Sequence, residues 1–253
     1  MIWLIVIGGV IAGCLIAVGV TALVDLVLAR KFDDSDDDRA GVKIGAAYAI
    51  YGIIIGMAVV SAQGTYDDAQ QSLRLEAGTI ISSYQIAQAL PDEEGKPVLE
   101  AFNAYVVADL ASWPSLASGD VDLTVPIAMR AVYDAVQSLS AYDDASNAQS
   151  TLMSALQTID QSRANRTFDA QKRLPGLLWA LLIVGGIVVI AMAAFLRFKD
   201  WRLRFGMILA TSVLIALGLI TIWALSNPYS STTGISTTPM DYVKELANHP
   251  SAS

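Results

Sequence analysis

Four apolar segments constrain this chain more than any other feature of its sequence. Each can cross the roughly 30 Å hydrocarbon layer of a bilayer, which takes about 20 residues of α-helix. Because lipid offers no hydrogen-bond partner to an open backbone, we expect every segment to be helical. The predicted spans are residues 1–29, 44–62, 174–196 and 205–225. The 54% hydrophobic content of the 253-residue chain is also typical of a membrane protein.

Basic residues in the two short loops predict the orientation of the spans. Loops 30–43 and 197–204 together hold eight of the sixteen Lys and Arg residues, and such clusters stay in the cytoplasm. The segment 63–173 and the polar tail 226–253 then lie outside the cytoplasm, as do both termini. Tryptophan side chains favour the membrane interfaces, and the predicted anchors are Trp3, Trp179 and Trp223 at the outer interface and Trp201 at the inner one.

The segment between the second and third spans has the pattern of a helical bundle. Apolar residues recur at three- or four-residue spacings in the set Ala69, Leu73, Ala77, Ile80 and Tyr84, and again in Leu99, Phe102, Val106 and Leu110. A third helix is expected from near Pro126 to about Ser140, after a loop over 115–126. A fourth is expected from about Asp143 to Arg173, a long helix whose charged end lies near the membrane and leads into the third span, with Pro175 marking the entry to lipid. The predicted fold is therefore all-α, with four spans and an inserted extracytoplasmic bundle.

Two arginines near the end of the fourth outer helix are the candidate functional residues. Arg163 and Arg166 lie within about 80° of each other on a helix, together with Arg173, so they share a face. Their guanidinium groups suit carboxylate, phosphate or halide, which predicts an outer anion site. Alternatively, they form structural ion pairs with Glu76 and Asp109 that fix the register of the helices. The sequence leaves both interpretations open.

Glycine pairs with four-residue spacing mark the spans. Such pairs let membrane helices approach closely, and they occur at Gly9 and Gly13, at Gly41 and Gly45, and at Gly52 and Gly56. One interpretation is packing within a single chain. The other is assembly of several copies, with the second span lining a central axis.

Three further features have ordinary explanations. Asp34, Asp36 and Asp38 have the spacing that opens a calcium loop, but the following glycine and glutamate are missing, which predicts a solvated loop. Asp25 lies near the inner end of the first span, where an acid inside the membrane is a candidate functional residue, but it is about one turn from Arg30 and we expect it to reach the interface. The residues before Cys14 resemble a lipoprotein cleavage box, but no Lys or Arg precedes the apolar segment, so we expect no processing.

The composition argues against several function classes. A formal net charge of −8 is unfavourable for binding nucleic acid. The chain has a single cysteine and a single histidine, His249, and no Gly-rich phosphate loop or nucleophile elbow. We therefore predict no enzyme activity, no metal site and no cofactor.

Several motifs together resemble the bestrophin-like domain family of bacterial membrane proteins, over about residues 41–246. They are the second span with its continuation "GTYDDA", then "LEAGTIISSYQIAQALP", "AYVVADLASWP", "SRANRTFDAQKRLPGLLWALL" and "LSNPYSSTTGIS". The sequence departs from the family pattern at Gln63, Ser112 and Ser226–Asn227, where the family has a tryptophan or carboxylates.

The resemblance implies a bacterial inner-membrane protein with kinship to anion channels. On that basis we expect a homo-oligomeric, channel-like or solute-passage protein with an outer vestibule, whose partners are the lipid bilayer and further copies of itself. The alternative is a non-conducting accessory or scaffold subunit of a larger membrane complex, whose outer helices dock another membrane or envelope complex.

Overall fold

The computed structural model describes residues 37–120, 122–171, 174–195, 201–230 and 233–248, and a few positions before residue 23. For residues 37–44 and 201 it describes the backbone alone. In these ranges the regular structure is helical and contains no strand. Most of the first predicted span lies outside the described residues, together with Trp3, Gly9, His249 and the acidic cluster at 34–36.

The chain divides into two units. The membrane unit comprises residues 1–64 and 174–226, and the bundle unit comprises residues 65–173 and 227–253. The long helix α2 (Asp37–Gln88) contributes its first half to the membrane unit and its second half to the bundle unit.

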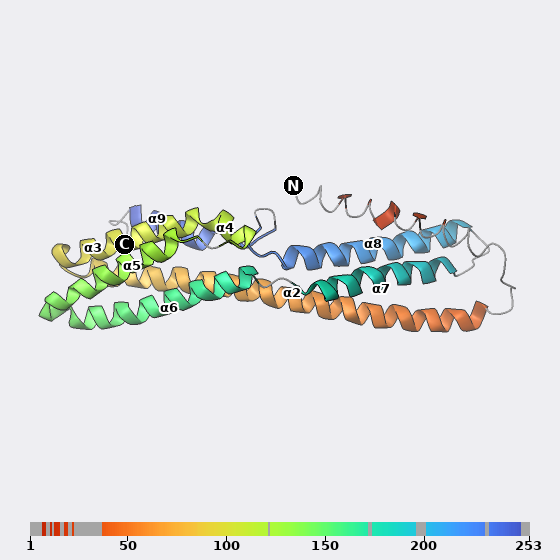
Figure 1. Cartoon of the computed structure of the whole chain (residues 1–253), viewed down its shortest axis with the longest axis horizontal. Coiled ribbons are helices and arrows are strands. Elements are labelled where there is room, and N and C mark those ends of the chain that lie inside the picture. The colour runs from red at the N-terminus through yellow and green to blue at the C-terminus, as the bar shows by residue number, and fades with distance from the viewer. Residues whose placement is uncertain are drawn as a thin grey trace. The chain divides into compact units, whose positions relative to one another are not determined.

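The membrane unit packs α7 (Gly176–Phe195) and α8 (Trp201–Leu225) along the first half of α2 (Figure 1). Its core combines Tyr51 of α2 with apolar residues of the other two helices, namely Val189, Ile190, Ala193, Ala194, Ile208 and Ile215. Most of the remaining apolar surface of these helices is exposed, as lipid-facing helices require. Among the described residues, three helical segments are long and apolar enough to cross a membrane. They belong to α2, α7 and α8.

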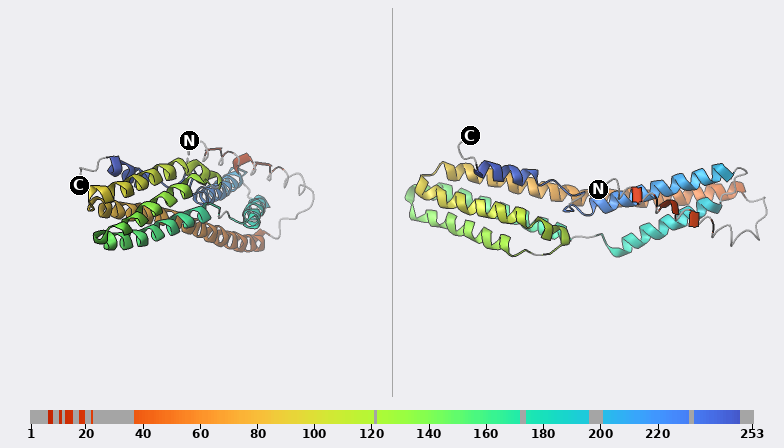
Figure 2. Two further views of the ribbon diagram at one scale, coloured as in Figure 1. Left: turned by 60° about the vertical axis from the view of Figure 1, so that its left-hand side comes forward. Right: turned by 90° about the horizontal axis from the view of Figure 1, so that it is seen from above.

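The helices of the bundle unit run side by side (Figure 2), and their buried apolar side chains form one core. These helices are the second half of α2, α3 (Asp92–Ala111), α4 (Trp113–Ser118), α5 (Thr124–Ser138), α6 (Ser146–Gln171) and α9 (Thr238–Asn248), with 3-10 turns η2 (Leu139–Ala141) and η3 (Asp143–Ala145). The expected stripe on α2, from Ala69 to Tyr84, is buried in this core. On α3, Phe102 and Val106 are buried, whereas Leu99 and Leu110 are partly buried at its edge.

A glycine permits the tight connection between α2 and α3. A Cβ atom on Gly95 would lie 2.3 Å from the carbonyl oxygen of Ala87, which is too close for any other side chain. Gly95 therefore lets the beginning of α3 approach the end of α2, and this brings the two apolar stripes into one core.

Pro175, the residue at which the sequence predicts entry into the third span, lies in the break between α6 and α7. Helix α6 ends at Gln171, Leu174 and Pro175 are not helical, and α7 begins at Gly176. Proline lacks a backbone N–H and disfavours helical geometry in the residue before it. Pro175 instead accepts hydrogen bonds from the backbone N–H groups of Leu178 and Trp179 at 2.9 and 3.2 Å, which is the geometry of a helix start.

Other boundaries also differ from the expected ones. Helix α2 begins at Asp37 and α8 at Trp201, so both predicted loops are shorter than 30–43 and 197–204. Within the loop expected over 115–126, residues up to Ser118 belong to α4, and α5 already begins at Thr124. The polar tail contributes α9, whose Met240 and Val243 are buried in the core of the bundle unit.

Candidate functional site: a buried arginine between two carboxylates

Helix α6 carries Arg166 into the core of the bundle unit. Its buried residues are Leu152, Leu156, Ile159, Ser162 and Arg166, which follow one another at three- or four-residue spacings. Arg166 therefore occupies a position where the pattern would otherwise place an apolar side chain. Only 1% of its surface is exposed, and a buried arginine requires partners for its charge.

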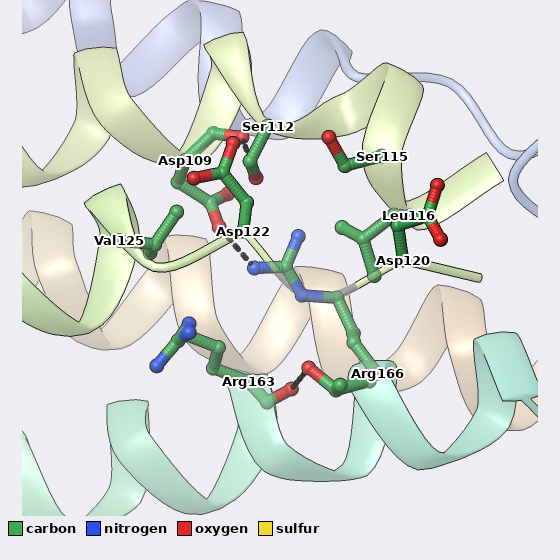
Figure 3. Close-up of a pocket in the computed structure, with 10 residues that line it drawn as sticks. Asp109, Ser112, Ser115, Leu116, Asp120, Asp122, Val125, Arg163 and Arg166 are labelled. Carbon is green, nitrogen blue, oxygen red and sulfur yellow. Dashed lines mark hydrogen bonds and ion pairs between the residues drawn. The ribbon is translucent and has the colours of Figure 1, made fainter. Parts of the chain in front are cut away.

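Two carboxylates supply those partners. Nη2 of Arg166 lies 2.6 Å from Oδ1 of Asp109 on α3 and 2.8 Å from Oε2 of Glu76 on α2. Glu76 is 0% and Asp109 1% exposed, so the whole cluster is closed to solvent. Figure 3 shows the guanidinium group of Arg166 reaching from α6 toward Asp109. The structure thus brings together three of the four charged residues that the sequence proposed for the anion site and its ion pairs, and they link α2, α3 and α6.

Aromatic side chains enclose this charged cluster. The Tyr105 hydroxyl group donates a hydrogen bond to Oε1 of Glu76 at 2.6 Å. The Trp113 ring centroid lies 5.7 Å from Cζ of Arg166, within the range of a cation–π interaction. The ring of Tyr229, from the segment after α8, packs edge-on against Trp113 with centroids 5.7 Å apart.

Burial dominates the electrostatics of the cluster. It raises the pKa of Glu76 from 4.5 to about 7, although the positive charge of Arg166 acts in the opposite direction. Burial also raises the pKa of Tyr105, and the neighbouring Glu76 raises it further. For Arg166, burial opposes the charged form, but the two carboxylates outweigh it and raise the pKa, so the guanidinium group stays protonated.

A small cavity adjoins the cluster. It has a volume of about 30 Å³, which is the space of about one water molecule. Its lining includes Asp109, Ser112, Ser115, Leu116, Asp120, Asp122, Val125, Arg163, Arg166 and Thr167, most of which Figure 3 labels. Nε and Nη1 of Arg166 and Oδ2 of Asp109 form no hydrogen bond with the described residues. A water molecule in this cavity would satisfy such groups.

The two arginines do not form one exposed pair. Arg163 is half-buried and lines the cavity, whereas Arg166 lies in the core. Arg163 is therefore the arginine of the two that solvent ions can approach. No group of three or more His, Cys, Asp or Glu side chains that could hold a metal ion occurs among the residues that the structure describes.

The glycines predicted for helix packing differ in their surroundings. A Cβ atom on Gly13 would lie 3.1 Å from Cβ of Ala216 on α8, so this glycine allows a close approach. By contrast, no atom of the described residues lies within 4 Å of a Cβ built on Gly45, Gly52 or Gly56. Gly41 lies in the part of α2 described by its backbone alone.

The two tryptophan side chains described in the spans differ in burial. Trp179 is partly buried and packs against a small core of Ala58, Ala62, Leu182 and Ile222. Trp223 is 38% exposed. Trp201 is described by its backbone alone.

Reasoning from individual residues missed the aromatic part of the cluster. Tyr105, Trp113 and Tyr229 occur in the motifs that carry the family resemblance, yet nothing in their spacing links them to Arg166. For Tyr105 a signal did exist, because it precedes Asp109 by one helical turn and so shares its face. For Tyr229 there was none, since its contact with Trp113 joins residues 116 positions apart in the chain.

Comparisons with known proteins agree with this architecture. Two solved structures, both variants of a bacterial bestrophin homologue from Klebsiella pneumoniae, align with TM-scores of 0.71 at 9% and 8% identity. They cover 98% and 96% of this chain, and the match includes 99% of each of those chains. A third structure, a variant described as a membrane protein, aligns with a TM-score of 0.71 at 8% identity over 98% of this chain and 99% of that one. At such low identity the similarity shows a shared fold. No curated protein matches the sequence.

The family model for the bestrophin-like domain matches residues 11–240. This range includes Glu76, Tyr105, Asp109, Trp113, Arg166 and Tyr229, and it covers most of both units. The chain is therefore a helical membrane protein that belongs to the bestrophin-like domain family.

Proposed function

We propose that this protein is a homo-oligomeric, channel-like protein of the bacterial inner membrane that lets a small solute, most simply an anion, pass. The observation that carries the proposal is the match to the bestrophin-like family over residues 11–240. In this arrangement the chain has four spans, and residues 63–173 form an extracytoplasmic helical domain around an outer vestibule. Both termini lie on the same side as that domain.

The uncovered face of α2 supports assembly through the second span. Tyr51, Ala58 and Ala62 pack against α7 and α8, whereas no described atom covers Gly45, Gly52 and Gly56. Three glycines that are open to a neighbour fit close contact with an equivalent helix of another copy. The second span would then lie near a central axis.

The two arginines take separate roles in this proposal. Arg166 is balanced by Glu76 and Asp109, so it fixes the packing of α2, α3 and α6 rather than attracting ions. Arg163 is half-exposed, and it carries the anion-attracting role at the vestibule. A guanidinium group at a partly open position can raise the local concentration of anions through its field.

Electrical recording tests the proposal. Purified full-length protein in planar bilayers should conduct under an anion gradient, with a reversal potential that follows the anion. Arg163→Gln should reduce the preference for anions, whereas Arg130→Gln, the same change at an exposed position of α5, should not. Absence of current under every anion gradient, together with a particle mass equal to one chain, would reject the channel.

The rival function is a non-conducting scaffold subunit, and exposed apolar residues favour it. Leu123 and Ile127 are 68% and 70% exposed at the beginning of α5, and Phe168 on α6 is 69% exposed. Large exposed apolar side chains in a domain outside the membrane are typical of protein contacts. Co-purification of a different protein that Ile127→Asp abolishes, with no measurable current, would support the scaffold.

A further inference from the structure

The buried cluster has an unequal number of acids and bases. Glu76, Asp109 and Arg166 each expose 1% of their surface or less. If all three were ionised, the core would hold a net charge of −1. An uncompensated buried charge costs several kcal/mol in folded proteins, and such groups usually become neutral instead. A neutral cluster therefore requires one further positive charge or one bound proton.

No second buried cation meets this requirement among the described residues. The titratable groups facing Glu76 are Tyr105 and Asp109 from α3, Arg163 and Arg166 from α6, and Tyr229 from the segment after α8. Of these, Arg163 is the other cation, but it is half-exposed and contributes least to the surroundings of Glu76. A proton on one of the two carboxylates is the simplest remaining way to balance the charge.

The hydrogen bonds indicate which carboxylate holds that proton. Oδ1 of Asp109 accepts a directed hydrogen bond from Nη2 of Arg166 at 2.6 Å, which favours the ionised form. Oε2 of Glu76 lies 2.8 Å from the same nitrogen but forms no hydrogen bond of good geometry. Its other oxygen meets the hydroxyl group of Tyr105, which can donate to a carboxylate or accept from a carboxylic acid.

We propose that Glu76 is a proton-binding site, and that release of its proton as the pH rises loosens the contact between α2, α3 and α6. The raised pKa of Glu76, about 7, agrees with this assignment. The folded protein then binds a proton that the unfolded chain, with the ordinary value of 4.5, has already lost. The stabilising effect is present at low pH and is lost as the pH rises through the folded value.

The proton-binding site at Glu76 does not require that the protein conduct ions. It belongs to the bundle unit, and it would operate equally in a channel or in a scaffold. Because α2 is one helix, Glu76 lies on the same element as the predicted second span. Helix α2 would thus have a pH-sensitive contact in its second half, while its first half has the proposed role in assembly.

Infrared spectroscopy of the full-length protein in detergent micelles tests the site directly. A carbonyl stretch of a protonated carboxylic acid should be present in the folded protein near pH 6, about one unit below the folded pKa of Glu76, and disappear near pH 9, about two units above it. Glu76→Gln should remove this band, because its amide copies the neutral acid. Glu100→Gln, the same change at an exposed position of α3, should leave the band in place.

Thermal unfolding provides the second readout. Between about pH 5 and 7 the midpoint of the wild-type protein should fall by roughly 3–5 °C for each pH unit from this group, and Glu76→Gln should remove that contribution. Asp109→Asn should also weaken it, since a single carboxylate beside Arg166 can remain ionised. The proposal is overturned if the wild-type protein shows no such band at pH 6, or if the pH dependence of Glu76→Gln equals that of Glu100→Gln. The spectrum of the wild-type protein decides the question even if the variant fails to fold.

Discussion

At the scale of single residues, Arg166 is expected to stabilise the bundle unit. Arg166→Met retains an apolar stem but leaves Glu76 and Asp109 without their cation. Removing one partner of a buried ion pair costs about 3–5 kcal/mol. We expect a loss of that size in the free energy of unfolding, measured by chemical denaturation in detergent micelles.

The neighbouring arginine provides a matched control. Arg163 lies on the same helix and is half-exposed, so Arg163→Met should lower the free energy of unfolding by less than about 1 kcal/mol. Equal losses for the two variants would contradict the structural role of Arg166. If the Arg166→Met protein were fully stable and had altered ion selectivity, Arg166 would be part of an anion site and not a structural ion pair.

Tyr51 packs closely against two glycines of α7 in the membrane unit. The Tyr51 hydroxyl group donates a hydrogen bond to the carbonyl oxygen of Leu182 at 2.7 Å. A Cβ atom on Gly186 would lie 2.8 Å from that hydroxyl oxygen, and a Cβ atom on Gly185 would lie 2.8 Å from the ring. We expect Gly186→Ala to destabilise the membrane unit by about 1–3 kcal/mol through overpacking, measured by unfolding in mixed micelles.

Two variants isolate this contact. Gly176→Ala makes the same change on the same helix where no described atom lies within 4 Å, so it should cause little loss. Adding Tyr51→Phe to Gly186→Ala removes the hydroxyl group that collides with the new methyl group, and it should restore part of the stability. If Gly176→Ala and Gly186→Ala behave alike, the contact does not determine the packing of α7.

The charged part of the buried cluster could be predicted from the sequence because each member interrupts an apolar stripe. Glu76 precedes Ala77 on α2, Asp109 follows Val106 on α3, and Arg166 follows Ile159 on α6 by two turns. Three polar residues on buried faces require one another. Tyr105, Trp113 and Tyr229 fit the core as ordinary aromatic residues, so their contacts emerge only from the packing of complete helices.

At the scale of elements, α9 is expected to be held by its apolar face. Met240 and Val243 are fully buried, whereas the adjacent Tyr242 is 55% exposed. Val243→Asp would bury a carboxylate without a partner, which is unfavourable by several kcal/mol. We expect α9 to detach from α3 in this variant, so that trypsin cleaves after Lys244 at least about 10-fold faster, which corresponds to a loss of about 1.4 kcal/mol.

Tyr242→Asp is the control, because it introduces the same charge on the neighbouring, exposed position. It should leave the rate of cleavage within about 2-fold of the wild-type rate. Rapid cleavage of the wild-type protein at Lys244 would contradict the docking of α9, as would slow cleavage of Val243→Asp.

Periodicity predicts where most helices lie, and backbone chemistry explains where it fails. The stripes of α2 and α6 are strong because their apolar residues face one continuous core. Leu174 and Pro175 are not helical, because a proline in a helix interior removes a hydrogen bond and collides with the preceding turn. Helix α4 has six residues, too few to show a period, and it went unpredicted.

At the scale of the whole molecule, the bundle unit includes two separate parts of the chain. The residues after 226 join the unit formed by residues 65–173, although α7 and α8 separate them in sequence. Tyr229, Ile235, Met240 and Val243 enter its core. Hydropathy cannot reveal this association, because a short amphipathic helix looks the same whether it docks on its own chain, on a partner or on a lipid surface.

Accessibility to a membrane-impermeant maleimide provides a test of the predicted orientation, in a Cys14→Ser background. The bundle unit contains Ser140, an exposed residue between α5 and α6, and the predicted cytoplasmic loop contains Lys199. Because basic loops stay inside the cell, Ser140→Cys should react in intact cells, whereas Lys199→Cys should react only after permeabilisation. Both variants should react equally in detergent, which checks that each thiol is available. The reverse pattern would place the bundle unit in the cytoplasm. Arg163 could then no longer attract anions at an outer vestibule. The proton-binding site at Glu76 would remain and would respond to cytoplasmic pH.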